Sequence, residues 1–246
     1  GQETHEGRGQ GGGRGKLPVP ASRGGERQMK FSVERAALLK AVNQAQSVVE
    51  RRNTIPILAN VLIEAEGSDV SFRATDLDIE VVDKVNAHVE RAGATTVSAT
   101  LLHEIVRKLP DGALINLTAD TAAATLPRED FPVMASSEYA SNFSAPAPVL
   151  RRLFDKSKFA ISTEETRYYL NGVYLHVADA DGGKVLRCVA TDGHRLARID
   201  ADLPDGAADM PGVIVPRKTV GELRKLLDDD DMKIAVSVSE TKIRFA

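Results

Sequence analysis

The sequence predicts an α+β fold made of two tandem copies of one domain, each with antiparallel sheets and two helices. Three pairs of similar segments occur in the same order in both halves: residues 31–42 and 143–154, 74–76 and 190–192, and 98–109 and 216–227. The offset grows from 112 to 116 to 118 residues, as small loop insertions would make it. Predicted strands outnumber helices, and each helix stands alone between hairpins. This order favours antiparallel sheets over βαβ winding.

The first 28 residues stand apart from both copies. They hold 9 of the 19 glycines and almost no apolar side chains, so they cannot bury enough surface to offset the entropy of ordering. Because Met29 begins a segment that resembles a natural start, we interpret residues 1–28 as an added or upstream extension. A Gly/Arg-rich arm for nucleic acid is the less favoured interpretation. We expect domains at residues 29–140 and 141–246.

In the first copy, apolar residues at helical spacing predict an amphipathic helix over residues 34–49. A second helix is predicted over residues 100–109, where Pro110, Asp111 and Gly112 end it. β-Branched runs between turn residues predict the strands of this copy: 57–64, 70–74, 79–89 and 114–117.

The second copy repeats this order, with helices predicted over residues 148–160 and 219–227. Its predicted strands are 168–177, 185–191, 197–199, 233–238 and 242–245. Alternation along the first of these strands would place Tyr168 and Leu170 on one face and Tyr169 on the other. One of the two tyrosines should then be exposed. The last hairpin is cut short, so the second copy is expected to be incomplete.

Composition limits the possible classes of function. The chain has a net charge of −3, and without residues 1–28 the 27 basic and 32 acidic side chains give 27 − 32 = −5, so it is no general polycation. Cys188 is the only cysteine, which excludes an intramolecular disulfide and an all-cysteine metal site. No apolar run reaches about 18 residues. These features favour a soluble protein of the reducing cytoplasm, with no membrane association.

Positive charge is expected on the outer face of all four predicted helices. The residues are Arg35, Lys40, Arg107, Lys108, Arg151, Arg152, Lys156, Lys158, Arg217, Lys218, Arg224 and Lys225. The acidic residues lie elsewhere, in turns and in the run at 228–231. Such a pattern suits one basic surface for a phosphate backbone, although on any single helix simple solvation explains the charges. Since aromatic residues are few, sequence reading by base stacking is not expected.

The densest group of reactive side chains is the segment 191–196. Asp192 and His194 have the chemistry of a general-base pair or of metal ligands. The first copy offers no matching histidine, so we favour an aspartate turn after a strand, with Gly193 at positive φ. Common phosphate-binding, hydrolase and zinc motifs are missing from the sequence. We therefore expect no catalytic site, no cofactor and no metal.

Several motifs together resemble one family, the bacterial DNA polymerase III β subunit or sliding clamp. They are MKFSVER at 29–35, IPIL at 55–58, ATDL at 74–77, TLP at 125–127, DFP at 130–132, RYYLNG at 167–172, ATDGHRL at 190–196 and VIVPRK at 213–218. The likeness extends over residues 29–246. It implies a homodimeric ring with three clamp domains per chain, in which helices line a hole around double-stranded DNA irrespective of sequence. Such a clamp does no chemistry and tethers the replicative polymerase in the bacterial cytoplasm, at the nucleoid during replication.

The resemblance also implies two sets of site residues. Arg52, Tyr168 and Lys218 match positions that approach DNA, and with the helix cations they give the predicted DNA contacts: Lys40, Arg52, Arg107, Lys108, Arg151, Arg152, Tyr168, Arg217 and Lys218. A hydrophobic groove takes short linear motifs from the polymerase catalytic subunit, the clamp loader, other polymerases and repair proteins. Its matching residues are Leu170, Thr191, Gly193, His194, Arg195 and Leu196.

The chain departs from the family pattern in three places. The third domain is absent, and the second stops before a segment that completes the groove. The stretch 118–124 is short, as if a hairpin strand were missing. Glu164 stands where the family often has an uncharged DNA-contacting residue. Two alternatives stay open: a scaffold for replication and repair proteins that does not encircle DNA, and a hydrolase that uses Asp192 and His194.

Overall fold

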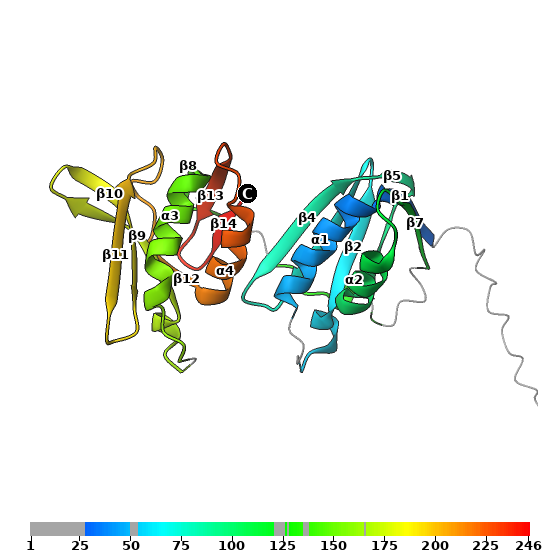
Figure 1. Ribbon diagram of the computed structural model, residues 1–246, viewed down its shortest axis with the longest axis horizontal. Helices are drawn as coiled ribbons and strands as arrows, with labels where there is room; N and C mark the ends of the chain where they lie inside the picture. The colour runs from blue at the N-terminus through cyan, green and yellow to red at the C-terminus, as the bar shows by residue number, and fades with distance from the viewer. Residues whose placement is uncertain (1–27, 50–53, 121–125, 127, 135–137, 165) are drawn as a thin grey trace, which may run out of the picture.

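The computed structural model describes residues 28–49, 54–120, 126, 128–134, 138–164 and 166–246 (Figure 1). These residues form two α+β units in which every strand pairing is antiparallel, so the predicted fold class is confirmed. Arg52, the first 27 residues and most of the short stretch at 118–124 lie outside the described residues.

The first unit has two sheets and two helices. One sheet has the order β5-β1-β7, from His88–Arg91, Gln28–Glu34 and Leu114–Asp120. The other has the order β4-β3-β2-β6, from Glu80–Asn86, Asp69–Thr75, Asn60–Glu66 and Gly93–Ser98. The helices are α1 (Arg35–Val48) and α2 (Ala99–Lys108), and short 3₁₀ turns are η1 (Pro56–Ala59) and η2 (Arg128–Asp130).

The second unit repeats this plan. One sheet has the order β14-β13-β8, from Ile243–Phe245, Lys233–Val238 and Ser141–Pro146. The other has the order β11-β10-β9-β12, from Leu196–Asp202, Gly183–Thr191, Gly172–Ala180 and Val213–Pro216. The helices are α3 (Ala147–Ser157) and α4 (Arg217–Leu226), with 3₁₀ turns η3 (Lys158–Ala160) and η4 (Tyr168–Leu170).

Each unit buries its own core. In α1 the residues at helical spacing, Leu38, Ala41, Val42 and Ala45, are all buried against α2, β3 and β4. In the second unit α3 packs on α4, β10 and β11. The large buried clusters hold residues 29–131 in the first unit and 143–238 in the second, with no cluster shared between them among the described residues. Each fully buried Leu or Phe contributes about 1.5–3 kcal/mol.

The structure corrects three predicted strands. The strand predicted at 168–177 begins only at Gly172, because η4 occupies its start and the Asn171 N–H donates to the Tyr168 carbonyl. As a result, alternation does not apply, and Tyr168 and Tyr169 are both exposed. Residues 57–64 open with η1, and residues 79–89 divide into β4 and β5, which belong to different sheets. Strands β1, β6, β8 and β12 were not predicted.

The three-stranded sheets of the two units differ at their edges, because β5 pairs with β1 in the first unit whereas β14 pairs with β13 in the second. In the second unit β13 pairs with β8 on one side and β14 on the other, and Ile234, Val236 and Val238 of β13 are buried. In the first unit β7 stands at the end of its sheet, with β1 as its only strand partner among the described residues. Its core-facing side chains, such as Leu117, are only half-buried. β7 ends within residues 118–124, the stretch that is shorter than the family pattern.

Candidate nucleic-acid interface and partner-binding turn

Most of the residues predicted to contact DNA have exposed side chains. They come from all four helices and from η4, and they are Lys40, Arg107, Lys108, Arg152, Tyr168 and Arg217. Arg151 and Lys218 are half-buried, and Arg52 is not among the described residues. Contact of these side chains with DNA stays a prediction.

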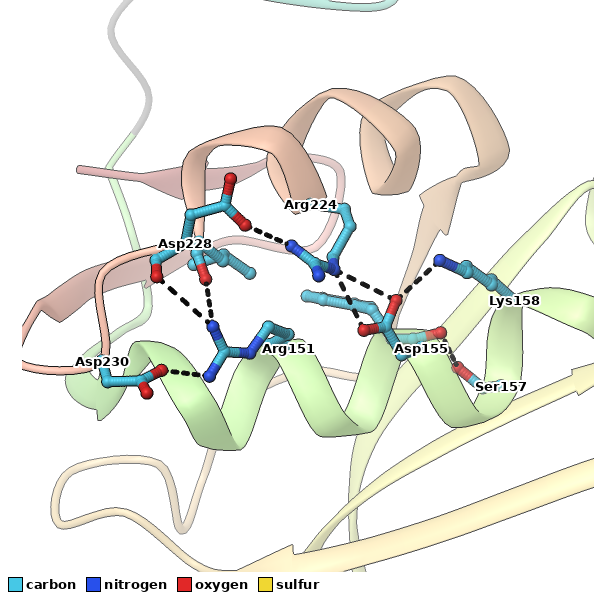
Figure 2. Close-up of polar contacts among 9 residues, drawn as sticks. Arg151, Asp155, Ser157, Lys158, Arg224, Asp228 and Asp230 are labelled. Carbon is cyan, nitrogen blue, oxygen red and sulfur yellow. Dashed lines mark hydrogen bonds and ion pairs between the residues drawn. The ribbon is translucent and has the colours of Figure 1, made fainter.

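Arg151 of α3 binds the C-terminal end of α4 (Figure 2). Its guanidinium donates to the Leu227 carbonyl at 3.1 Å and to the Asp228 carbonyl at 3.5 Å, and it pairs with the Asp230 carboxylate. The last carbonyls of a helix have no partner within the helix, and the negative end of its dipole favours a cation there. Arg151 therefore holds α3 and α4 together.

Arg224 makes a second link between the same helices (Figure 2). Its guanidinium pairs with Asp155 of α3 at 3.0 Å and with Asp228 at 2.7 Å. Burial alone would raise the pKa of Asp155, but hydrogen bonds from Lys158 and Arg224 outweigh it and lower that pKa. Asp155 is thus an anion between two cations.

These pairs correct the predicted separation of charge. The acidic run at 228–231 was expected to lie away from the basic helices, yet Asp228 and Asp230 reach Arg224 and Arg151. A turn directly after α4 necessarily stays near α4, and the packing of α3 against α4 brings Arg151 to it. The positive charge open to a ligand is therefore smaller than the sequence suggests on these two helices.

Arg35 plays the same part in the first unit. From the start of α1 it donates to the carbonyls of Val106 at 3.1 Å and Arg107 at 3.0 Å, and it pairs with Asp111. These groups lie at the C-terminal end of α2. In both units an arginine of the first helix thus satisfies carbonyls at the end of the second.

The segment 191–196 forms a tight turn between β10 and β11. Thr191 Oγ1 accepts from the Gly193 N–H at 3.1 Å and donates to the Arg195 carbonyl at 2.7 Å. Asp192 Oδ1 accepts from the N–H groups of His194 at 2.9 Å and Arg195 at 3.0 Å. Gly193 has φ of +90°, a conformation that side chains disfavour. The aspartate turn expected from the sequence is therefore formed.

The hydrogen bonds also fix the charge of Asp192. The two backbone N–H donors, assisted by the Arg195 guanidinium at 3.0 Å from Oδ2, lower the pKa of Asp192 to about 2. Because its pKa is so low and both oxygens serve the turn, Asp192 is a poor general base near neutral pH. No cluster of metal-ligating side chains occurs among the described residues.

The turn presents apolar side chains next to charged ones. Leu196 is 65% exposed and Phe159 is 55% exposed, while the Arg195 guanidinium lies 5.7 Å from the centre of the Phe159 ring. A Cβ on Gly193 would meet Arg167 Nη1 at 3.8 Å, so the segment before η4 lies beside the turn. Leu170 of η4 is half-buried.

Phe159 and Arg167 were not singled out by sequence reasoning as groove residues. Both are far from residues 191–196 in the chain, and no local pattern indicates that η3 and η4 meet the turn. Arg167 also pairs with Glu164 at 3.0 Å, so the carboxylate that stands where the family often has an uncharged residue has a cationic partner. Tyr168 and Tyr169 stand edge to face with ring centres 5.5 Å apart.

The described helices include none long and apolar enough to cross a membrane.

Two family descriptions match the chain in sequence order. "DNA polymerase III beta subunit, N-terminal domain" matches residues 29–147, and "DNA polymerase III beta subunit, central domain" matches residues 145–246. Together they extend over both units of the structure.

Individual proteins give the same result. The chain is 50% identical over 231 residues to the beta sliding clamp of Caulobacter vibrioides, which covers 88% of this chain and 62% of the relative. Identity to the beta sliding clamp of Pseudomonas aeruginosa is 38% over 229 residues, covering 88% of this chain and 61% of the relative. The chain thus spans about three fifths of the length of these relatives.

Solved structures are similar in fold as well as in sequence. A beta sliding clamp of Caulobacter crescentus superimposes with a TM-score of 0.85 at 50% identity, covering 90% of this chain and 62% of that one. A sliding clamp of Bartonella birtlesii with bound griselimycin gives 0.83 at 50% identity, covering 89% and 62%. The chain belongs to the DNA polymerase III beta subunit family.

Proposed function

We propose that this chain carries two of the repeated domains of a DNA sliding clamp, a processivity factor that tethers the replicative polymerase. In this proposal the whole protein dimerises into a ring around duplex DNA, in the bacterial cytoplasm. The observation that carries the DNA part is the distribution of exposed cations. They stand on every one of the four helices, and Lys40 of α1 lies at the place in the repeat that Arg152 of α3 occupies in the second unit.

The proposed contact with DNA is sequence-independent. Exposed Lys and Arg side chains suit phosphate oxygens, which carry no base information. The chain has few aromatic side chains for base stacking, and its overall charge is negative. Contact energy alone should therefore be weak, and encirclement by the ring would keep the protein on DNA.

The turn at 191–196 supports a second part of the proposal, a groove for short linear motifs of partner proteins. Leu196 and Phe159 offer apolar surface, and Leu170 lies on η4 nearby. Thr191, Gly193, His194 and Arg195 complete the set. The expected partners are the polymerase catalytic subunit, the clamp loader, other polymerases and repair proteins. The protein would be an accessory subunit without chemistry of its own.

The test of the DNA contact is a salt titration of affinity on two unrelated duplexes of equal length. We expect weak and equal binding to both duplexes. Replacing Arg107 and Lys108 with glutamine should reduce the slope of log K against log salt by about 1.8, since each phosphate contact contributes about 0.9.

A matched control removes the same charge from a sheet. Lys184 and Arg198 are exposed on β10 and β11, and changing both to glutamine should leave the slope unchanged. Preference for one duplex, or an equal loss of slope in the control, would contradict the proposed interface.

One observation favours the second candidate, a scaffold that does not encircle DNA. Arg151 and Arg224 form ion pairs with Asp155, Asp228 and Asp230, so their positive charge is less available to phosphate. A scaffold predicts that the Arg107 and Lys108 substitutions leave the salt slope unchanged while griselimycin still binds. The same titration therefore separates the two functions.

A further inference from the structure

Lys218 connects the two units. It lies in the first turn of α4, the helix of the second unit nearest the first unit in Figure 1. Its Nζ donates to the Val48 carbonyl at 3.0 Å and pairs with the Asp76 carboxylate. Both acceptors belong to the first unit, at the end of α1 and in the turn after β3. Lys218 was predicted to contact DNA, so this placement bears directly on its role.

Neither helix alone explains a lysine at this place. The positive end of a helix dipole lies at its N-terminus and disfavours cations there, and α4 has no acidic residue in its first turn. The C-terminal end of α1 favours a cation, yet α1 has no basic residue in its last turn. When the two units lie together, Lys218 supplies the cation at the end of α1, and Asp76 brings a carboxylate to the first turn of α4.

The same device occurs inside each unit. Arg35 satisfies carbonyls at the end of α2, and Arg151 satisfies carbonyls at the end of α4. The end of α1 is supplied by Lys218 from the other unit. This recurrence indicates that the Lys218 contact is part of how the helices are held in place.

The two carboxylate oxygens of Asp76 have different partners. Asp76 Oδ1 accepts from the N–H groups of Asp78 at 3.0 Å and Ile79 at 2.7 Å, as Asp192 Oδ1 does in its own turn. The other oxygen of Asp76 faces Lys218, whereas that of Asp192 faces Arg195 of the same turn. The Asp76 side chain is only 6% exposed and that of Asp192 is 21% exposed.

We propose that Lys218 is a positioning residue, which fixes the second unit against the first through Asp76 and the Val48 carbonyl and does not serve as a DNA contact. The contact stands independently of the proposed clamp function. Its meaning for a ring rests on that function, because a closed ring needs each junction between domains to keep one angle.

The test is the distance distribution between two spin labels, one in each unit. Cysteines introduced at Glu104 of α2 and Asp181 of the β9–β10 turn are exposed sites for labelling. The natural Cys188 is fully buried, and burial raises its pKa to about 12, so its thiol stays protonated and unlabelled.

Two variants remove the junction while sparing the fold. Lys218→Met keeps the length of the side chain without its charge. Asp76→Asn keeps an oxygen for the two N–H groups of the turn and removes the ion pair. We expect both to broaden the label distribution, Lys218→Met at least as much as Asp76→Asn because it also removes the bond to the Val48 carbonyl. The double variant should broaden the distribution no further than Lys218→Met alone, because both changes remove the ion pair.

The chain supplies matched controls. Asp192→Asn makes the same change in the same kind of turn, and Lys225→Met removes a cation of α4 that pairs within the helix with Glu222 at 2.8 Å. Both should leave the distribution unchanged. A retained cooperative thermal transition in each variant shows that loss of fold is not the cause.

The proposal is overturned if Lys218→Met leaves the distribution narrow, or if Asp76→Asn has no effect where Lys218→Met does. A pure phosphate contact at Lys218 would give a different result. Lys218→Met would then reduce the salt slope for DNA by about 0.9 with no change in the label distances. This outcome would support the proposed clamp function while rejecting the junction.

Discussion

The turn after β3 and the turn after β10 have the same construction and different surroundings. In each, a threonine hydroxyl accepts from the N–H two residues on, and an aspartate caps two further N–H groups. The first turn is tied to the second unit by Lys218. In the second turn Asp192 pairs with Arg195 of the same turn, whose guanidinium lies over the Phe159 ring, and Leu196 is exposed. The repeated turn thus forms part of the contact between the units after β3, whereas after β10 it leaves Leu196 accessible.

The residue at the sharpest point of each turn also differs. Gly193 has φ of +90° and Leu77, at the equivalent position, has φ of +81°. Leu77 is the only non-glycine residue with positive φ among those described. A leucine in this conformation is strained by about 1–2 kcal/mol. The hydrogen bonds to the Thr75 and Asp76 side chains must therefore hold the backbone of the turn in this conformation. The junction turn is therefore the more constrained of the two.

The largest effect should come from removing the aspartates. Asp76→Ala leaves two N–H groups of the turn without an acceptor and Lys218 without its carboxylate, so we expect the free energy of unfolding of the first unit to fall by about 2–3 kcal/mol. Asp192→Ala should cost less, because its turn is more exposed. Chemical denaturation of both variants measures the difference, and an equal or greater loss for Asp192→Ala would show that the two turns do not differ in this way.

A smaller effect should follow from exchanging the residues at positive φ. Gly193→Ala should destabilise by about 1–2 kcal/mol through the backbone alone, since the new Cβ has room beside Arg167. Leu77→Gly should relieve strain and stabilise by up to about 1 kcal/mol. Opposite shifts in the thermal midpoint would show that the positive φ strains Leu77 but not Gly193, and shifts of the same sign would show that φ is not the cause.

The smallest effect concerns pH. The pKa of Asp192 is about 2 in the folded chain, below the value of about 3.9 for an unfolded aspartate. The unfolded chain therefore binds this proton more readily, and the stabilisation, complete above about pH 4, is lost as pH falls towards 2. The amide NMR signals of His194 and Arg195 should shift with a midpoint near 2. A midpoint near 4 would mean that the turn does not hold the carboxylate.

Much of the fold was predictable because its signals are local. The spacing of Leu38, Val42 and Ala45 marks α1, and the predicted bounds of the four helices are within a few residues of the observed ones. Tyr168 and Tyr169 were mispredicted because apolar and aromatic residues before Gly172 look like a strand, whereas they form a 3₁₀ turn whose Leu170 carbonyl accepts from the Ser162 N–H at 3.0 Å.

The candidate site was predictable only in part, for the same reason. The Asp192 turn is encoded within six residues and formed as expected. The pairing of Arg151 with Asp230, the approach of Phe159 to Arg195 and the reach of Lys218 to Asp76 join residues far apart in the chain. Only the packing of helices and units brings these groups together, so composition and spacing predicted the charges but not their partners.

The most direct test of this account is which turn responds to griselimycin, which is bound in the sliding clamp of Bartonella birtlesii. The amide NMR signals of the protein would be followed as griselimycin is added. We expect shifts at His194, Arg195 and Leu196 and none at Asp78 and Ile79, because the Asp76 carboxylate of the first turn is bound to Lys218 of the second unit. Equal shifts in both turns, or shifts confined to the first, would contradict it.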